Sequence, residues 1–217
     1  LFLSATFGTT VTALANSLLR NPVNVNLAPT ALPVETVTQS VYAVAQHQKT
    51  ELLVDLLQDN NIFSALVFTR TKARAERLAG ALARHNVRAE RIHGDRSQSQ
   101  RSRVLEGFKD GRYRVLVATD VAARGIDISD LGHVINYDVP QEPADYIHRI
   151  GRTARAQNTG DAITFVSSEE TELFARIERS LGKQVDRAEH RLTDAAIGDT
   201  LKKPSVPVRR TFTRRRR

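Results

Sequence analysis

The 217-residue sequence predicts an α/β fold in which a mostly parallel sheet carries helices on both faces. Short apolar runs, such as 65–68 and the residues 115–118 that end the expected strand 113–118, suit strands that are buried on both faces. Amphipathic stretches with helical spacing alternate with these runs. Polar residues follow the runs directly, and in a parallel sheet such residues meet at the carboxyl edge, where ligands bind.

The first part of the chain differs in pattern from the rest. Two prolines between residues 28 and 33 indicate a linker. We expect residues 1–27 to be the remnant of a preceding domain and residues 34–182 to form the main domain. Within the first segment we expect the end of a strand at 1–3, a helix at 10–19 and a short strand at 23–27.

From residue 34 onward, strands and helices are expected to alternate. Thr71 suits the N-cap of a helix, and the pairs Ser97/Gln100 and Ser167/Glu170 fit capping boxes. The expected strands are 37–44, 65–68, 87–92, 113–118, 134–137 and 162–166, and the expected helices are 49–57, 71–83, 97–108, 143–150 and 169–181.

The formal net charge of +8 comes from the end of the chain. Residues 202–217 hold eight of the 32 basic residues and no acidic one, so the remaining 24 basic residues balance the 24 acidic residues. We expect residues 183–217 to form a disordered basic tail that binds nucleic-acid phosphates without reading sequence. The alternative is a segment that only keeps the protein soluble.

Composition excludes several classes of site. There is no cysteine, which excludes disulfides and thiolate metal sites and favours a reducing compartment such as the cytoplasm. The six histidines show no close metal-ligand spacing, and no apolar run approaches the roughly 18 residues needed to span a bilayer. The chain begins with leucine and contains no methionine, so we expect a processed chain or a fragment of a longer protein.

The segment His148–Arg155 concentrates three arginines and one histidine. Guanidinium groups fork onto phosphate oxygens, so this cluster suits a polyanion or a developing phosphoryl charge. The alternative is an exposed basic helix face, on which Asp145 and Arg149 would form a surface ion pair four residues apart. Gly151 would cost about 1 kcal/mol inside a helix, so we place a helix end there and the later arginines on a loop.

Three segments occur in an order that is typical of one family: Leu66–Thr71, Ala118–Ile128 and His148–Arg155. Together they resemble the second RecA-like domain of DEAD-box RNA helicases, most closely the bacterial RhlE-like group. Ser4-Ala5-Thr6 resembles the motif that closes the first RecA-like domain, and Gln98–Arg101 resembles the family's Q-x-x-R element. The resemblance covers residues 1–182. It implies a RecA-like fold and an ATP-dependent RNA helicase whose nucleotide lies between two such domains.

The resemblance also implies roles for individual residues. Arg152 and Arg155 resemble the arginine fingers that reach the γ-phosphate of ATP. The other implied roles are nucleotide binding by Gly125 and Asp127, RNA-backbone contacts by Thr69, Arg70, Gln98, Arg101 and Thr119, and coupling between domains by Arg124, His148, Ser4 and Thr6.

Several of these residues have simpler explanations. Thr119 could cap a short helix, Asp127 could pair with Arg124, and Arg70 could pair with a nearby acid. Ala154 stands where the family usually has glycine, and alanine disfavours a positive φ. If that position needs a left-handed backbone, the reach of Arg155 is affected.

The sequence contains neither a phosphate-binding G-x-x-x-x-G-K-[ST] loop nor Asp-Glu-Ala-Asp. We therefore expect ATP with Mg²⁺ to be held mainly by the N-terminal RecA-like domain of the same protein, and this chain alone to be inactive. A non-catalytic RNA-binding or regulatory module is the alternative. A DNA helicase is disfavoured by the combined motifs at 123–127 and 148–153.

Overall fold

The computed structural model describes residues 9–23, 25, 37–58, 62–123, 131–153 and 160–202. The chain divides into two compact units, Leu1–Leu32 and Pro33–Arg217. In the first unit, α1 (Thr9–Leu18) confirms the predicted helix, and Leu14 and Leu18 on it are exposed. The strand expected at 1–3 and most of the one at 23–27 lie outside the described residues, and the assignment of 1–27 to a preceding domain stays a prediction.

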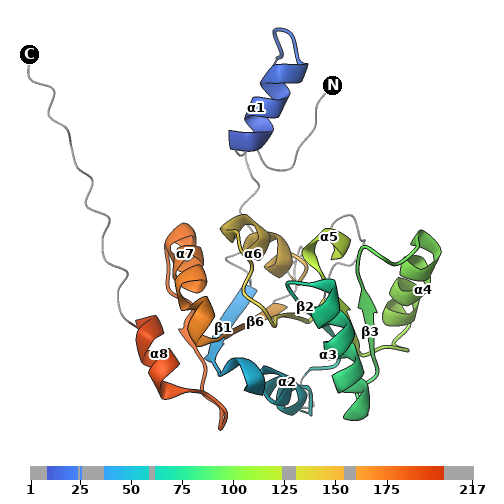
Figure 1. Ribbon diagram of the computed structural model, residues 1–217, viewed down its shortest axis with the longest axis vertical. Coiled ribbons are helices and arrows are strands. Elements are labelled where there is room, and N and C mark those ends of the chain that lie inside the picture. Colours follow the sequence, from blue (N-terminus) through green and yellow to red (C-terminus); the bar gives the residue numbers. More distant parts are fainter. Residues whose placement is uncertain are drawn as a thin grey trace, which may run out of the picture. The chain divides into compact units, whose positions relative to one another are not determined.

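The described part of the second unit contains one seven-stranded sheet in the order β3-β4-β2-β5-β6-β1-β7 (Figure 1). Every strand pair is parallel, which confirms the predicted fold class. In the register, Leu66 of the central strand lies opposite Leu116 on one side and Val134 on the other. The strands are β1 (Val37–Ala43), β2 (Ala65–Phe68), β3 (Ala89–Ile92), β4 (Val115–Ala118), β5 (His133–Asn136), β6 (Gly160–Val166) and β7 (Asp186–Arg187).

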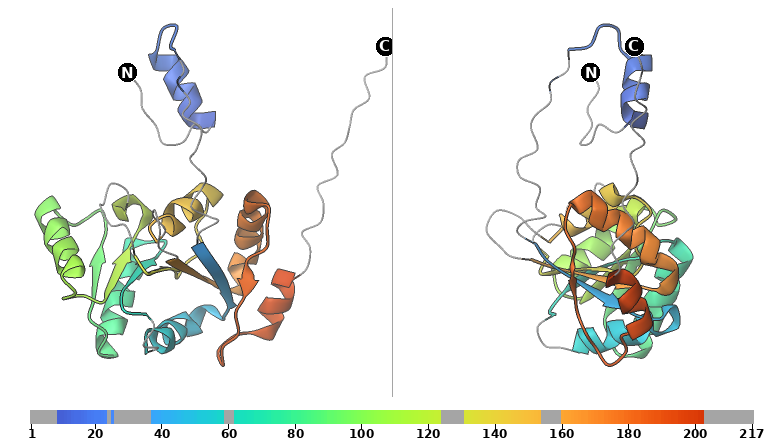
Figure 2. Two further views of the ribbon diagram at one scale, coloured as in Figure 1. Left: turned by 180° about the vertical axis from the view of Figure 1, so that it is seen from behind. Right: turned by 90° about the vertical axis from the view of Figure 1, so that its left-hand side faces the viewer.

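Helices cover both faces of this sheet (Figures 1 and 2). Side chains alternate across a strand, so Ala65 and Val67 pack toward α2 and α3, whereas Leu66 and Phe68 pack toward α4 and α5. On β1 and β6, the second face packs against α6, α7 and α8. The helical elements are η2 (Gln46–Gln48), α2 (Lys49–Gln58), α3 (Lys72–Arg84), α4 (Gln98–Lys109), α5 (Asp120–Ala123), α6 (Pro143–Ile150), η3 (Ser168–Glu170), α7 (Thr171–Leu181) and α8 (Ala195–Lys202).

The capping predictions are confirmed. The Thr71 hydroxyl accepts from Arg74 N at 3.2 Å and starts α3, while Ser97 and Gln100 form a reciprocal capping box at the start of α4. Ser167 and Glu170 also form a capping box, but it opens the short helix η3 rather than α7 itself. Gly151 is the C-cap of α6, as predicted, with φ −64, so no left-handed backbone requires glycine there.

The turns at the amino edge of the sheet do use left-handed residues. Asn86 has φ 59 in the turn after α3, and Gly111 has φ 72 in the turn after α4. Asparagine and glycine tolerate this conformation better than other residues, which lets each helix stop and the chain enter the next strand.

The prediction of a disordered segment beginning at residue 183 is wrong for residues 183–202, which form β7 and α8. Ile197 and Leu201 lie four residues apart on α8 and are buried against the core. Arg187 forks onto Glu178, with Nη1 2.7 Å from Oε1 and Nη2 3.0 Å from Oε2. The two-residue strand and one short helix are too brief for a clear period in the sequence. Residues 203–217 lie outside the described residues.

The start of β6 packs unusually close to the end of the α6 segment. A Cβ added at Gly160 would clash with the hydroxyl and the carbonyl oxygen of Thr153 and lie 2.8 Å from its carbonyl carbon. Thr153 itself is buried and donates to the carbonyl oxygens of Leu131 and Gly132. This contact fixes the chain directly after Arg152.

None of the described helices is long and apolar enough to cross a lipid bilayer. The described residues also contain no group of three or more histidines and acidic residues placed to hold a metal ion.

Candidate functional site

Polar residues gather at the carboxyl edge of the three central strands. Arg70 follows β2, Asp120 follows β4 and Asp138 follows β5, and β2 lies between the other two in the sheet. The chain moves from one side of β2 to the other between β4 and β5, so this edge is the topological switch point at which open parallel sheets bind ligands. The predicted convergence at one edge is confirmed.

Arg149 is buried at this edge. Its side chain is 2% exposed, and Nε and Nη2 lie 2.6 and 2.8 Å from the two carboxylate oxygens of Asp120. Nη1 donates to Asn136 Oδ1 at 3.1 Å and to the Asp138 carbonyl oxygen at 2.7 Å. Helical spacing predicts a surface ion pair between Asp145 and Arg149, and this prediction is therefore wrong. Asp120 lies across the sheet edge, its side chain is 28% exposed, and it offers the buried guanidinium a bidentate partner.

Arg152 and His148 lie beside this pair. They line a small hollow together with Asp120, Asp145 and Phe68. The hollow measures about 20 Å³, far below the roughly 300 Å³ or more of a typical ligand pocket. His148 is 41% exposed, with Nδ1 4.0 Å from Asp145 Oδ1. This surface can therefore form one wall of a nucleotide site and not a whole pocket.

Arg70 pairs with an acid, as the simpler explanation proposed. Nη2 donates to Glu170 Oε1 at 2.9 Å, and the backbone N–H donates to Asp138 Oδ2 at 2.8 Å. The Arg70 side chain is still 37% exposed, so its guanidinium also borders the surface. Contact between Arg70 and RNA stays a prediction.

Glu170 collects several donors inside the domain. Its side chain is 4% exposed, and Oε2 lies 2.5 Å from Lys49 Nζ. Val139 N donates to Oε1 at 3.2 Å, and the hydroxyl of Ser167 donates to Oε2 at 3.0 Å. Together with Arg70, these groups tie the ends of β2, β5 and β6 to one carboxylate.

Lys49 was not identified from the sequence, because a lysine that begins an amphipathic helix is normally exposed. Here it is fully buried, and Nζ also donates to the carbonyl oxygens of Tyr137 at 2.8 Å and Phe165 at 3.3 Å. Burial lowers the pKa of Lys49, and the neighbouring Glu170 partly opposes that shift.

The two threonines predicted to contact RNA are buried. Thr69 has no exposed surface, and its hydroxyl donates to the Thr71 carbonyl at 3.4 Å. Thr119 is 8% exposed, and its carbonyl accepts from Ala123 N at 2.9 Å, which starts α5. A direct side-chain contact from Thr69 would require the end of β2 to open. Thr71, which follows on the exposed side, was predicted only as a helix cap.

Gln98 and Arg101 lie in the first turn of α4. Arg101 Nη1 is 3.4 Å from Gln98 Oε1, and Nη2 donates to the Ala122 carbonyl at 3.0 Å. Arg101 Nε is buried without a hydrogen-bond partner among the described protein atoms. The structure thus brings Arg101 to α5, next to Thr119, and its contact with RNA stays a prediction.

Comparison with known proteins identifies the family to which the chain belongs. Residues 48–157 match the family described as "Helicase conserved C-terminal domain". The solved structure of the E. coli DEAD-box protein SrmB bound to regulator of ribonuclease activity A is 37% identical, with a TM-score of 0.67, and the match covers 70% of this chain and 90% of that chain. The chain belongs to the DEAD-box helicase family.

Two further DEAD-box proteins show how much of the relatives this chain spans. CshA of Bacillus subtilis (strain 168), a DEAD-box ATP-dependent RNA helicase, is 41% identical over 197 residues, which cover 91% of this chain and 40% of CshA. The structure of S. cerevisiae Dbp5 bound to RNA and ADP BeF3 is 31% identical with a TM-score of 0.76, covering 92% of this chain and 54% of that chain. The chain therefore spans about two fifths of the length of CshA.

The remaining residues to which the DEAD-box resemblance gives a role lie outside the described residues. They are Ser4, Thr6, Arg124, Gly125, Asp127 and Arg155, and Ala154 lies there as well. Their roles stay predictions.

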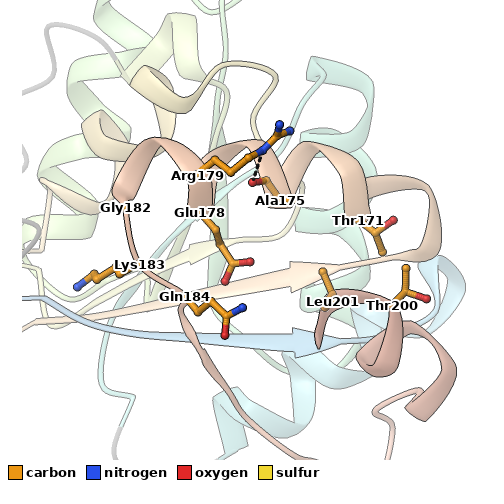
Figure 3. A pocket seen from close by; sticks show the side chains of 9 residues that line it. All are labelled: Thr171, Ala175, Glu178, Arg179, Gly182, Lys183, Gln184, Thr200 and Leu201. Atoms are coloured by element: carbon orange, nitrogen blue, oxygen red, sulfur yellow. Dashed lines mark hydrogen bonds between the residues drawn. The ribbon is translucent and has the colours of Figure 1, made fainter. Parts of the chain in front are cut away.

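A larger hollow of about 320 Å³ lies elsewhere in the DEAD-box domain, between α7 and α8 (Figure 3). Glu178 in its lining is engaged by Arg187 and by Val185 N, and Arg179 Nε donates to the Ala175 carbonyl at 3.3 Å. None of the predicted site residues lines this hollow. Size alone therefore does not locate the chemistry, and we place the site at the carboxyl edge.

Proposed function

We propose that this chain is the C-terminal half of an ATP-dependent RNA helicase. It supplies the arginine fingers Arg152 and Arg155 to the γ-phosphate of ATP and part of the track for the RNA backbone. The observation that carries the proposal is the placement of Arg152 beside Asp120 and His148, at the carboxyl ends of the central strands. A guanidinium there can meet the charge that develops during phosphoryl transfer.

In this proposal the N-terminal RecA-like domain of the same protein is the essential partner. It holds most of ATP with Mg²⁺, which supplies the transferable phosphoryl group, and Gly125 and Asp127 add contacts to the nucleotide. The small hollow beside Arg152 supports this division, because it is far too small to enclose a nucleotide by itself.

RNA is proposed to cross the adjacent part of the same edge. Arg70, Gln98, Arg101 and Thr119 follow or border β2 and β4, where exposed basic groups can hold phosphates without reading bases. Such backbone recognition suits an unwinding enzyme that tolerates different sequences. The side chains of Thr69 and Thr119 would join only if the strand ends opened, because both are buried here.

RNA-stimulated ATP hydrolysis in the full-length protein tests the proposal. Arg152→Ala should lower the turnover number by about 10³-fold, the lower range for an arginine finger, with little change in the free energy of unfolding. Arg84→Ala is the matched control, since Arg84 is an exposed arginine at the far end of α3. The isolated chain should show no turnover.

Unchanged turnover in Arg152→Ala would overturn the finger role. If the variant also kept its RNA affinity, a non-catalytic RNA-binding module would become the better description. Preference for a DNA duplex over an RNA duplex, measured side by side in an unwinding assay, would overturn the assignment of RNA as substrate.

A further inference from the structure

The fork between Arg149 and Asp120 joins the two segments on which the proposed RNA and ATP contacts depend. Asp120 begins α5 and directly follows Thr119, whose carbonyl accepts from Ala123 N at 2.9 Å. Arg149 lies in the last turn of α6, and its carbonyl accepts from Arg152 N at 3.1 Å. One rigid turn of backbone therefore separates each partner of the fork from a proposed ligand contact.

The groups around the bidentate ion pair between Arg149 and Asp120 hold it in one geometry. Both carboxylate oxygens of Asp120 are within 2.8 Å of Arg149 nitrogens, and the third guanidinium nitrogen is held by Asn136 and the Asp138 carbonyl. The guanidinium carbon also lies 4.9 Å from the centre of the Phe68 ring. A planar group held on every side transmits a displacement of one partner to the other, whereas an exposed pair would rotate freely.

Stability alone is a weak reason for such a pair. Arg149 is buried and Asp120 is 28% exposed, and the loss of hydration costs much of what their attraction returns, so such ion pairs often contribute little to net stability compared with apolar packing. Their better-supported use is to specify one arrangement of the parts they join. Here the joined parts are α5 and the end of α6.

We propose that Arg149 is the positioning residue through which RNA bound at Thr119 sets the position of the Arg152 finger. The inference rests on the proposed function. RNA that draws in Thr119 moves the single turn of α5, Asp120 moves with it, and the fork carries α6 and Arg152 along. Arg149 touches neither RNA nor nucleotide in this scheme.

The coupling between RNA and nucleotide tests this role in the full-length protein. The affinity of a non-hydrolysable ATP analogue is measured with and without a short oligouridylate, and the ratio of the two dissociation constants gives the coupling. Arg149→Lys keeps the charge and loses the fork. We expect it to reduce the coupling by about tenfold or more, while the affinity for RNA without nucleotide changes less than about twofold.

Arg187→Lys is the matched control. Arg187 also forks onto a carboxylate, that of Glu178, and lies 5.6 Å from the ring of Phe174, but it is not near the predicted site residues. The control should show a comparable shift in thermal midpoint with wild-type coupling. Equal loss of coupling in both variants would assign Arg149 a merely structural role and overturn the proposal, as would wild-type coupling in Arg149→Lys.

Asp120→Asn provides a second variant if Arg149→Lys fails to fold, because it alters the same fork from the other side. It should reduce the coupling in the same direction, and retained coupling in this variant overturns the proposal. The wild-type protein separates the two hypotheses. If it shows no RNA-stimulated turnover, the proposed function fails; if it shows turnover and the fork variants keep their coupling, only the positioning role fails.

Discussion

Lys49 Nζ and Glu170 Oε2 lie 2.5 Å apart in the interior of the domain, and the second oxygen of Glu170 holds Arg70 at the surface. One buried carboxylate therefore connects the first turn of α2 with the loop that follows β2. These ion pairs therefore hold the carboxyl edge together. Their contribution to the stability of the domain can be measured separately from activity.

Glu170→Ala should lower the free energy of unfolding by about 3–5 kcal/mol, because it leaves Lys49 buried without its opposite charge. Urea unfolding followed by circular dichroism measures the change. Glu169→Ala is the matched control at an exposed neighbour, and we expect it to stay within about 0.5 kcal/mol of wild type. A loss below about 1 kcal/mol in Glu170→Ala would show that Lys49 does not depend on this carboxylate.

Tyr146→Phe should remove part of the alkaline sensitivity of the fold. Burial raises the pKa of Tyr146 to about 12, so its contribution to stability is complete below pH 10 and is lost as the pH rises through about 12. The difference in the free energy of unfolding between wild type and variant should move against wild type by up to about 2.7 kcal/mol across this window, which is enough to reverse its sign. The lowered pKa of Lys49 acts in the opposite direction, but it is common to both proteins.

Urea unfolding at several pH values between 8 and 12 tests this expectation, which concerns the difference between the two proteins and not either curve alone. At pH 8 the variant should already be less stable by about 1 kcal/mol, since Tyr146 donates to buried Gln39 at 3.0 Å. Parallel curves from pH 8 to 12 would mean that Tyr146 ionises as easily in the folded protein as in the unfolded chain.

Gly160→Ala should destabilise the domain by about 1–3 kcal/mol, because the new methyl group meets the backbone of Thr153. It should also lower RNA-stimulated ATP turnover of the full-length protein, since Thr153 directly follows Arg152. Gly132→Ala is the control, because a Cβ there meets nothing within 4 Å. Equal stability of the two variants, measured by thermal unfolding, would contradict the close packing described here.

Leu201→Ala should lower the free energy of unfolding by about 2–4 kcal/mol, because Leu201 on α8 is buried in the core against α7. Thr200→Ala, at the exposed neighbouring position, should have a far smaller effect. The comparison tests whether the folded domain extends to Lys202. Equal stability of both variants would mean that α8 belongs to the tail and not to the folded domain.

Replacing Arg214 to Arg217 by glutamine should weaken RNA binding without changing the length of the tail. For each RNA phosphate that the tail no longer neutralises, the slope of log affinity against log salt should fall by about 0.7 on single-stranded RNA. Titrations of the full-length protein at several salt concentrations measure the slope. An unchanged slope would leave the tail a solubilising segment only.

The sequence was sufficient for the framework because strands and helices here have strong patterns. Unbroken apolar runs located β2 and β4, and the helix at 143–150 has the predicted bounds because proline starts it and glycine follows its end. The short elements β7 and α8 were missed because two and eight residues give too little periodicity, and the four-residue α5 was anticipated only as a short helix that Thr119 could cap.

The site was predictable only as far as local chemistry determines it. The convergence of Arg70 and Thr119 at one edge followed from strand direction, whereas the position of Arg152 did not, because Arg152 follows a helix. The ion-pair partners could not be predicted in this way. Arg149 pairs with Asp120 and not with Asp145, which is nearer in sequence, and Lys49 pairs with Glu170, because tertiary packing decides which charges are brought together. Spacing along one helix cannot give that choice.

The turns at Asn86 and Gly111 lie at the amino edge of the sheet, whereas Arg70, Thr119 and Asp138 lie at the carboxyl edge. Because the chain contains no cysteine, a single cysteine placed at exposed His85 would be its only thiol. A fluorophore attached there, paired with a second dye on the N-terminal RecA-like domain that we propose, would follow the approach of the two domains by energy transfer at a distance from Arg70 and Thr119.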